Sequence, residues 1–429
     1  MEEKITIVMA DKYDLVVGDT FQLYYRGIIE APNPFIYDIL AVCVKGKGFP
    51  RYYEFTPEKE GEYTLTISVF DAKKNLLGKA QTQLVVTMPK ENTRPLNILC
   101  MGSSTTAGGQ WANEANRRLT ATDGEPLGLG FKNINFVGTC KKENTGYEGY
   151  GGWLWKTFYE TGNTNMWVYT NYNMDAEDQH SIWKDENGNE WKLETLDIRR
   201  LKFLPYGDND GKIKPESGKL THVANAIHTD DIIFTSSAYE KCSPFYDEKT
   251  DSISFKAYCE RNGYDKIDAM YVMLGMNGLL DVKGDILGYC PDIVRQAKVI
   301  ADLLHRDFPN AKLKVMGIIM PSTTGGVGWN YGAVMPYCDG YNLRRFVLRL
   351  NELFNEWTKE EAYKDFVEYI NTSGQFDCDN NFPEVEKPVN TRSKKTEMIG
   401  INGLHPLEEG YMQIADAAFR NMVRFCKEN

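Results

Sequence analysis

The chain has 429 residues and a formal net charge of -11 at pH 7. That length exceeds one average domain and predicts two or three compact units with ample core. Apolar residues make up 42% and charged residues 25%, which excludes a disordered or fibrous chain. An acidic chain repels phosphate backbones, so nucleic acid is not an expected partner. No stretch approaches the roughly 20 apolar residues of a membrane helix, so no membrane span is expected.

The cellular compartment is inferred from the start of the chain and from its cysteines. The chain opens Met-Glu-Glu-Lys, without the basic start and apolar core of a secretion signal. Nine cysteines are spread without clustering, and several stand in apolar runs where a buried free thiol is the simpler interpretation. We therefore expect a reducing, cytoplasmic compartment, with a trimmed secreted form as the alternative.

Residues 1–90 show short alternating runs separated by turn residues. This spacing, without helical periodicity, predicts a small all-β sandwich of the immunoglobulin-like kind, an accessory domain followed by a linker at 88–95. The predicted strands are Phe21–Tyr25, Ile39–Val44, Tyr63–Val69 and Gln83–Val86.

From residue 95 to 429, apolar strands alternate with helical patterns. The alternation predicts a parallel sheet covered by helices on both faces, a three-layer α/β/α fold with ligands at the carboxyl ends of its strands. The predicted strands are Leu96–Met101, Ile134–Val137, Ala269–Leu274, Leu313–Ile319 and Phe366–Ile370. The predicted helices are Trp111–Leu119, Pro291–His305, Tyr341–Trp357 and Pro406–Cys426.

A long region of weak periodicity, about 141–265, interrupts this alternation. It is too long for a plain crossover and is predicted to be an insertion with its own local structure. It is rich in Trp, Tyr, Asn and Gly and holds five of the eight tryptophans, at positions 153, 155, 167, 183 and 191.

The first predicted strand of the α/β part ends in Gly102-Ser103-Ser104-Thr105-Thr106. A serine there lies at the carboxyl edge of the sheet, near a helix N-terminus whose free amides favour negative charge. Serine needs a base to act as a nucleophile, and a lone turn of this kind is more often a helix cap. Ser104 is the preferred candidate and Ser103 the alternative.

Two further motifs stand at matching places. His405 precedes Pro406 in a loop that enters the last predicted helix, where an imidazole can face a strand end. Asn277 follows the central strand in Leu274-Gly275-Met276-Asn277-Gly278 and could donate to an oxyanion. Gly152, in a glycine-rich turn, could offer a backbone N–H to the same charge. Taken alone, the histidine and the Asn-Gly pair are more often structural, and the glycines are equally explained by a flexible turn.

Taken in chain order, these motifs resemble the SGNH (GDSL-like) hydrolases, a family of serine esterases. The resemblance implies that Ser104 is the nucleophile and an oxyanion donor, with Gly152 and Asn277 as the other donors and His405 as the base. It also implies acyl transfer through an acyl-enzyme, without a cofactor. No metal is expected, since the chain lacks the zinc and nucleotide-binding motifs, and an acidic run at 377–381 lacks calcium-loop spacing.

The chain departs from the family at three positions. Ser103 and Gly278 replace aspartates that neither attack nor abstract a proton, whereas Asn402 stands where the family has the aspartate that orients the histidine. Loss of that carboxylate costs about 10⁴ in turnover in serine proteases. Three outcomes stay open: a dyad oriented by Asn402 or by main chain, an acid from elsewhere, or a degenerate site. The candidate acids are Glu408, Glu397 and Asp377.

The family acts on several esters, so substrate choice comes from the aromatic residues. Trp and Tyr near the strand ends suit flat sugar faces better than alkyl chains, which predicts a carbohydrate O-acetylesterase. The predicted substrate-binding residues are Trp153, Trp155 and Trp329. The alternatives are that the tryptophans pack the insertion's own core, that the enzyme is a lipolytic or broad short-chain esterase, or that the chain is a catalytically weak glycan-binding protein.

Overall fold

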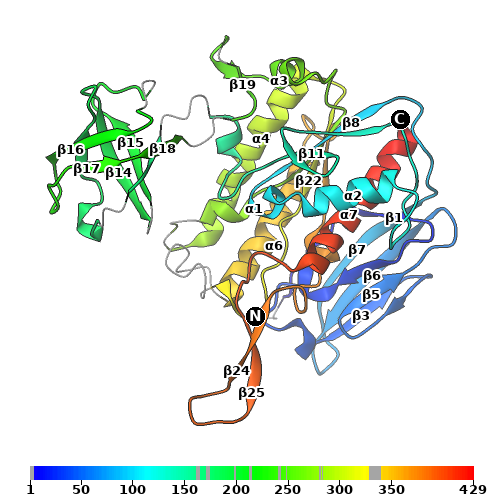
Figure 1. The fold of residues 1–429 in the computed structure, drawn as a ribbon. Helices are drawn as coiled ribbons and strands as arrows, with labels where there is room; N and C mark the ends of the chain where they lie inside the picture. Colours follow the sequence, from blue (N-terminus) through cyan, green and yellow to red (C-terminus); the bar gives the residue numbers. More distant parts are fainter. Residues whose placement is uncertain are drawn as a thin grey trace. The chain divides into compact units, whose positions relative to one another are not determined.

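The computed structural model describes residues 4–160, 165–170, 174–197, 200–211, 215–239, 243–247, 249–279, 282, 284–327 and 340–429 (Figure 1). The chain divides into two compact units, one formed by Met1–Thr157 with Phe255–Asn429 and the other by Phe158–Ser254. Within the described residues, every helix is too short or too polar to cross a membrane.

The larger unit contains a sheet built on five parallel strands. Numbered along the chain, they take the order 2-1-3-4-5, which is the flavodoxin-like order. Because these strands are buried, their sequences are nearly continuous apolar runs. The structure confirms all five predicted strands. Their bounds are β8 (Leu96–Gly102), β9 (Ile134–Val137), β21 (Ala269–Met273), β22 (Lys312–Met316) and β23 (Val367–Ile370).

Two further strands extend this sheet beside the end of β8. β11 (Thr145–Gly149) pairs with β8 in parallel, and β10 (Cys140–Lys142) pairs with β11 in antiparallel.

Helices with one apolar stripe each accompany the sheet. Figure 1 shows α2 beside α7 and α4 beside α6, and these pairs make extensive contacts. In α4 the buried positions Ile293, Ala297, Ile300 and Leu304 recur at helical spacing. The four predicted helices are confirmed, and α3 is added. The bounds are α2 (Gln110–Thr120), α3 (Phe255–Asn262), α4 (Cys290–Asp307), α6 (Gly340–Trp357) and α7 (Glu408–Glu428).

The N-terminal strands form two sheets, in the orders β1-β7-β6-β3 and β2-β5-β4. All four strands predicted there are present, and β1, β4 and β5 are added. The bounds are β1 (Lys12–Val16), β2 (Phe21–Tyr24), β3 (Asp38–Val42), β4 (Lys47–Gly48), β5 (Tyr52–Phe55), β6 (Gly61–Phe70) and β7 (Leu76–Thr87).

These N-terminal strands share a compact unit with the α/β sheet, although the sequence predicted a separate accessory domain. Buried ion pairs connect the two parts. Asp19 lies 2.6 Å from the guanidinium groups of both Arg118 on α2 and Arg420 on α7. Asp14 pairs with Arg424 of α7 at 2.5 Å. The predicted boundary at 90–95 separates an all-β part from an α/β part, but both parts lie in one compact unit.

The second unit is a seven-stranded sheet whose pairings are antiparallel. This sheet lies inside the predicted insertion. The predicted range was too wide, because it also covers β10, β11 and α3, which belong to the larger unit. Trp183 and Trp191 are fully buried in its core. The strands are β12 (Met166–Tyr169), β13 (Ile182–Lys184), β14 (Glu190–Asp197), β15 (Arg200–Tyr206), β16 (Gly218–Ala224), β17 (Ile232–Phe234) and β18 (Ser236–Tyr239).

Short elements complete the described chain. The hairpin of β24 (Glu384–Pro388) and β25 (Thr396–Gly400) projects from the larger unit and leads into the loop that carries His405. The others are β19 (Tyr246–Asp247), β20 (Ser252–Ile253) and the 3-10 helices η1 (Tyr25–Gly27), η2 (Pro34–Ile36), η3 (Lys156–Phe158), η4 (Ala176–Asp178), η6 (Ile286–Tyr289) and η7 (Ser373–Gln375).

Candidate active site

Ser104 begins the single-turn helix α1 (Ser104–Ala107) directly after β8. Gly102 permits this sharp turn, because a Cβ there would lie 2.2 Å from the hydroxyl oxygen of Thr106. The Ser103 carbonyl accepts the amides of Thr106 and Ala107, both at 2.9 Å. The turn places Ser104 between β8 and β21, where the strand order reverses and open α/β sheets bind their ligands.

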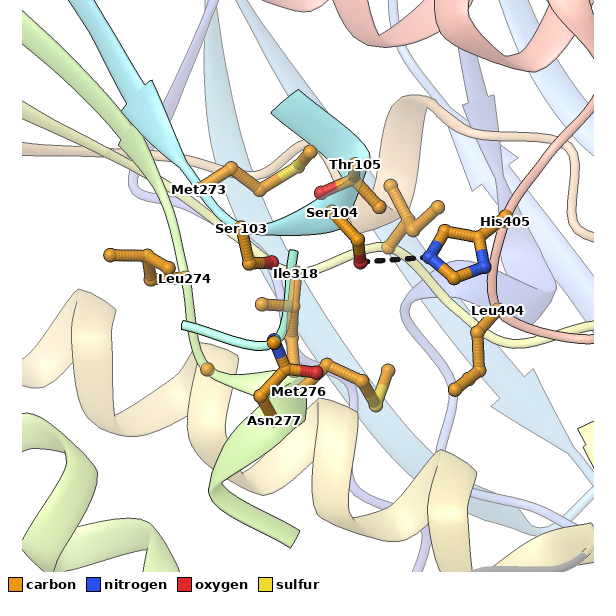
Figure 2. A pocket seen from close by; sticks show the side chains of 13 residues that line it. Ser103, Ser104, Thr105, Met273, Leu274, Met276, Asn277, Ile318, Leu404 and His405 are labelled. Atoms are coloured by element: carbon orange, nitrogen blue, oxygen red, sulfur yellow. Dashed lines mark hydrogen bonds between the residues drawn. The ribbon is translucent and has the colours of Figure 1, made fainter. Parts of the chain in front are cut away.

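His405 lies opposite Ser104, although 301 residues separate them in the sequence. Its Nε2 is 2.7 Å from the Ser104 Oγ, within the reach that proton transfer requires (Figure 2). Burial of the imidazole lowers the pKa of His405 below its ordinary value of 6.5. The ring is therefore neutral at pH 7, the state that a general base needs.

Asn402 contacts His405, but with the opposite polarity from a carboxylate. Its Oδ1 accepts the backbone N–H groups of Leu404 and His405, at 3.1 and 3.0 Å. Both lone pairs of the oxygen are then used, so the amide nitrogen faces the His405 Nδ1, at 3.4 Å. Of the alternatives for orienting His405, acceptance of the imidazole proton by the Asn402 carbonyl does not fit this geometry, because backbone N–H groups occupy that oxygen.

This contact has a consequence for the imidazole tautomer. An amide N–H at Nδ1 favours a proton on Nε2, whereas a base acting on Ser104 needs a lone pair there. At 3.4 Å the contact is long for a hydrogen bond, so its preference for that tautomer is weak.

The three candidate acids have other surroundings. Glu408 and Glu397 are exposed, at the start of α7 and on β25. Asp377 pairs with Arg51 and accepts the amide of Asp379. Among the described residues, no hydrogen bond or ion pair joins any of these acids to His405.

A pocket of about 290 Å³ opens in front of Ser104 and His405. The predicted oxyanion donors Gly152 and Asn277 both line it, as does Ser103. Within the described part of the chain, the backbone N–H groups of Ser104 and Gly152 donate to no acceptor. Asn277, on the 3-10 helix η5 (Met276–Leu279), uses one amide proton on the Trp153 carbonyl, at 3.1 Å, which leaves the other for a ligand.

Apart from Thr105, the rest of the pocket is apolar, and no sequence pattern pointed to these residues. Its apolar residues end or follow the buried strands β21 and β22 or precede His405, where apolar side chains look like ordinary core. They are Met273, Leu274, Met276, Ile318, Ile319 and Leu404.

Of the three predicted sugar-binding tryptophans, the structure describes two, and they differ in burial. Trp155 is 1% exposed and donates its Nε1–H to the Leu274 carbonyl at 3.1 Å. It cannot present a face to a sugar, so that prediction is wrong. Trp153 is half-buried and stacks on Tyr150 with ring centroids 4.1 Å apart. Trp329 lies outside the described residues.

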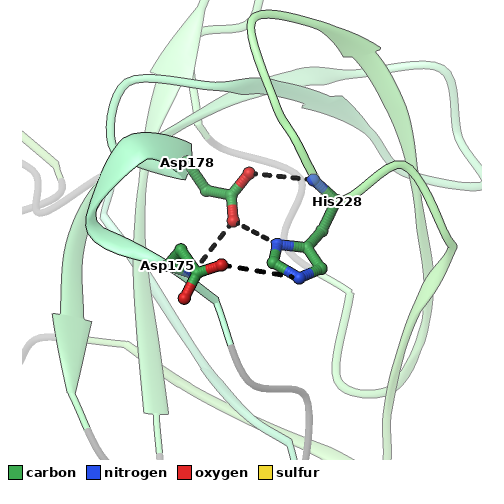
Figure 3. Close-up of side chains that lie close together, drawn as sticks. All are labelled: Asp175, Asp178 and His228. Carbon is green, nitrogen blue, oxygen red and sulfur yellow. Dashed lines mark hydrogen bonds and ion pairs between the residues drawn. The ribbon is translucent and has the colours of Figure 1, made fainter.

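One group of side chains in the second unit has the proximity of metal ligands among the residues described: Asp175, Asp178 and His228 (Figure 3). Asp178 is buried, and its carboxylate accepts from the His228 Nδ1 at 2.7 Å and from three backbone amides. Although burial opposes ionisation, these hydrogen bonds hold the pKa of Asp178 below its usual value. Internal hydrogen bonds already occupy this carboxylate, which indicates a structural role.

Comparison by sequence finds no matching family model and no matching curated protein. Comparison by structure finds a carbohydrate esterase family 3 protein from Talaromyces cellulolyticus, at 12% identity over 78% of this chain and 99% of that chain, with a TM-score of 0.34. A carbohydrate acetylesterase from Sinorhizobium meliloti has 13% identity over 77% and 99% and a TM-score of 0.33.

A third similar structure is a carbohydrate esterase family 2 enzyme with a carbohydrate-binding domain, from Corynascus thermopiles (Myceliophthora fergusii). It covers 99% of this chain and 93% of its own, at 10% identity and a TM-score of 0.32. All three carry the name esterase, the class that the sequence motifs predicted.

Proposed function

We propose that this chain is a serine esterase that hydrolyses short acyl esters, with O-acetyl groups on carbohydrate as its substrates. The observation that carries the proposal is the 2.7 Å contact between the Ser104 Oγ and the His405 Nε2, in a pocket at the point where the strand order reverses. We also propose that helices cover both faces of the parallel sheet, in a three-layer α/β/α arrangement.

The mechanism follows from the positions of the donors. His405 Nε2 takes the proton of the Ser104 hydroxyl as Oγ attacks the ester carbonyl carbon. The N–H groups of Ser104 and Gly152 and the amide of Asn277 stabilise the resulting oxyanion. Collapse breaks the bond to the alcohol, which takes the proton from His405. Water, activated by the same imidazole, then releases the acid from Ser104.

We propose that Ser104 and His405 act as a dyad, with Asn402 as a turn residue. The Asn402 oxygen accepts the backbone N–H groups of Leu404 and His405. These hydrogen bonds fix the position of the His405 backbone, from which the imidazole extends. The low pKa of His405 supports a neutral base at pH 7. The weak amide contact at Nδ1 lowers the population of the productive tautomer without excluding it.

The pocket favours one second candidate. Its volume of about 290 Å³ and its apolar lining have room for an acyl group longer than acetyl, which supports a broad short-chain esterase. In favour of sugar, Trp153 is only half-buried and directly follows Gly152. The two candidates differ in how activity depends on acyl length.

Hydrolysis of p-nitrophenyl esters from acetate to octanoate tests the proposal, with Ser104→Ala and Ser103→Ala alongside. A preference for acetate, abolished only by Ser104→Ala, supports the acetylesterase. A maximum at butyrate or hexanoate supports the broad esterase. If the wild type hydrolyses none of these esters, nor an acetylated oligosaccharide, faster than Ser104→Ala, the catalytic proposal fails and glycan binding becomes the function to test.

A further inference from the structure

A fully buried carboxylate lies at the end of β11, just before the turn that carries Gly152. Glu148 is 0% exposed, and four groups donate to it. Its Oε1 accepts the Thr139 backbone N–H and the Tyr258 hydroxyl, both at 2.7 Å. Its Oε2 accepts the Tyr150 hydroxyl and, at 3.1 Å, the hydroxyl of Thr139. A buried carboxylate is costly to keep, and these donors make it a rigid anchor.

One of these donors connects Glu148 to the predicted oxyanion donors. The Tyr150 ring stacks on Trp153, with an angle of 28° between the ring planes. The Trp153 backbone N–H donates to the Tyr150 carbonyl at 3.3 Å, which closes a turn with Gly152 inside it. The Trp153 carbonyl accepts the Asn277 amide at 3.1 Å. A chain of contacts therefore runs from Glu148 through Tyr150 and Trp153 to Asn277.

The same turn is attached to the strand that carries the nucleophile. The Tyr150 backbone N–H donates to the Gly102 carbonyl at 3.1 Å, two residues before Ser104. Gly149 pairs with Gly102 in the sheet, and a Cβ on Gly149 would lie 2.6 Å from the Thr106 backbone of α1. The start of the turn, at Gly149, thus lies against α1 with almost no free space.

We propose that Glu148 is a positioning residue for the oxyanion site. Through the Tyr150 hydroxyl it holds the turn Gly149–Trp153, and with it the Gly152 N–H and the Asn277 amide, in register with Ser104. The proposal rests on the proposed esterase function for its kinetic readout. It also makes a structural claim that can be measured without catalysis, namely that the Tyr150 hydroxyl holds the turn.

Two tyrosines provide a matched test. Tyr150→Phe and Tyr258→Phe each remove one hydroxyl from the same carboxylate, but only Tyr150 belongs to the turn. We expect Tyr150→Phe to lower kcat about 10- to 100-fold with KM within about 3-fold, less than the loss of a whole oxyanion donor. We expect Tyr258→Phe to leave kcat within about 3-fold. The thermal unfolding midpoints of the two variants report whether either has lost the fold.

A second readout is independent of turnover. Hydrogen–deuterium exchange of the peptide covering 149–154 should accelerate in Tyr150→Phe and stay at the wild-type rate in Tyr258→Phe. Equal losses of kcat in the two variants, or unchanged exchange in Tyr150→Phe, would overturn the positioning role. If the wild type is not an esterase, the exchange result still decides whether Glu148 anchors the turn. The proposed function fails separately, when Ser104→Ala leaves hydrolysis unchanged.

Discussion

Replacing Asn402 by aspartate tests how the imidazole is oriented. In Asn402→Asp one carboxylate oxygen keeps the two backbone N–H groups of Leu404 and His405, and these donors favour its ionised form. The other oxygen takes the place of the amide nitrogen, 3.4 Å from the His405 Nδ1, and turns a donor into an acceptor. We therefore expect the variant to be more active than the natural chain.

The size of the gain follows from the new hydrogen bond. A hydrogen bond to a charged group contributes about 1.5–3 kcal/mol. If the transition state gains it fully, kcat/KM rises about 10- to 150-fold, since about 1.4 kcal/mol is tenfold. The same interaction stabilises the imidazolium, so the acid limb of the pH profile should move up by about one to two pH units.

The assay is kcat/KM for p-nitrophenyl acetate between pH 5 and 9. Asn402→Ala is the control, because it removes the acceptor of both backbone N–H groups as well as the amide, and we expect it to be less active than wild type. A folded Asn402→Asp enzyme with activity equal to or below wild type, and an unmoved acid limb, would refute the assignment of the amide orientation.

Three further predictions concern pH and stability. Because burial lowers the pKa of His405, the fall of kcat/KM on the acid side should have its midpoint below pH 6.5; a midpoint above 6.5 would contradict a desolvated imidazole. Asp19→Ala leaves Arg118 and Arg420 buried without their shared partner, so chemical denaturation should report a loss of about 3–5 kcal/mol, against under about 1 kcal/mol for the exposed control Lys74→Ala. Burial opposes ionisation of Asp19, but Arg420 and Arg118 hold its pKa below the usual value. The contribution of Asp19 to folding stability is therefore fully present above the pKa of the unfolded state, and it is lost as the pH falls through the pKa of the folded state. The hydrogen bond to Asp178 raises the pKa of His228, and Asp178→Asn should lower it in an NMR titration; an unchanged value would show that the contact is absent in solution.

Much of the larger unit could be predicted from the sequence. Five buried strands alternate with helices of clear periodicity, and the rule that ligands bind at carboxyl strand ends places Ser104 and Asn277 at one edge. The motif order then singled out His405 among five histidines. The structure brings the Ser104 Oγ within 2.7 Å of its Nε2.

Other features depend on contacts that no local pattern records. Trp155 follows a glycine-rich turn in the sequence, a position typical of a surface residue. In the structure it is buried, and its indole N–H donates to the Leu274 carbonyl. The direction of the Asn402 amide is decided by two backbone N–H groups, which depend on the loop conformation. Glu148 gave no signal, because its donors Tyr258 and Thr139 become neighbours only in the folded chain.

Labelling with a fluorophosphonate tests the central claim most directly, because the reagent reacts with an activated serine and needs no knowledge of the substrate. The structure predicts one covalent adduct, located on Ser104 by peptide mass spectrometry, and its loss in both Ser104→Ala and His405→Ala. An unlabelled wild-type chain, an adduct on Ser103, or labelling that persists in His405→Ala would contradict the account.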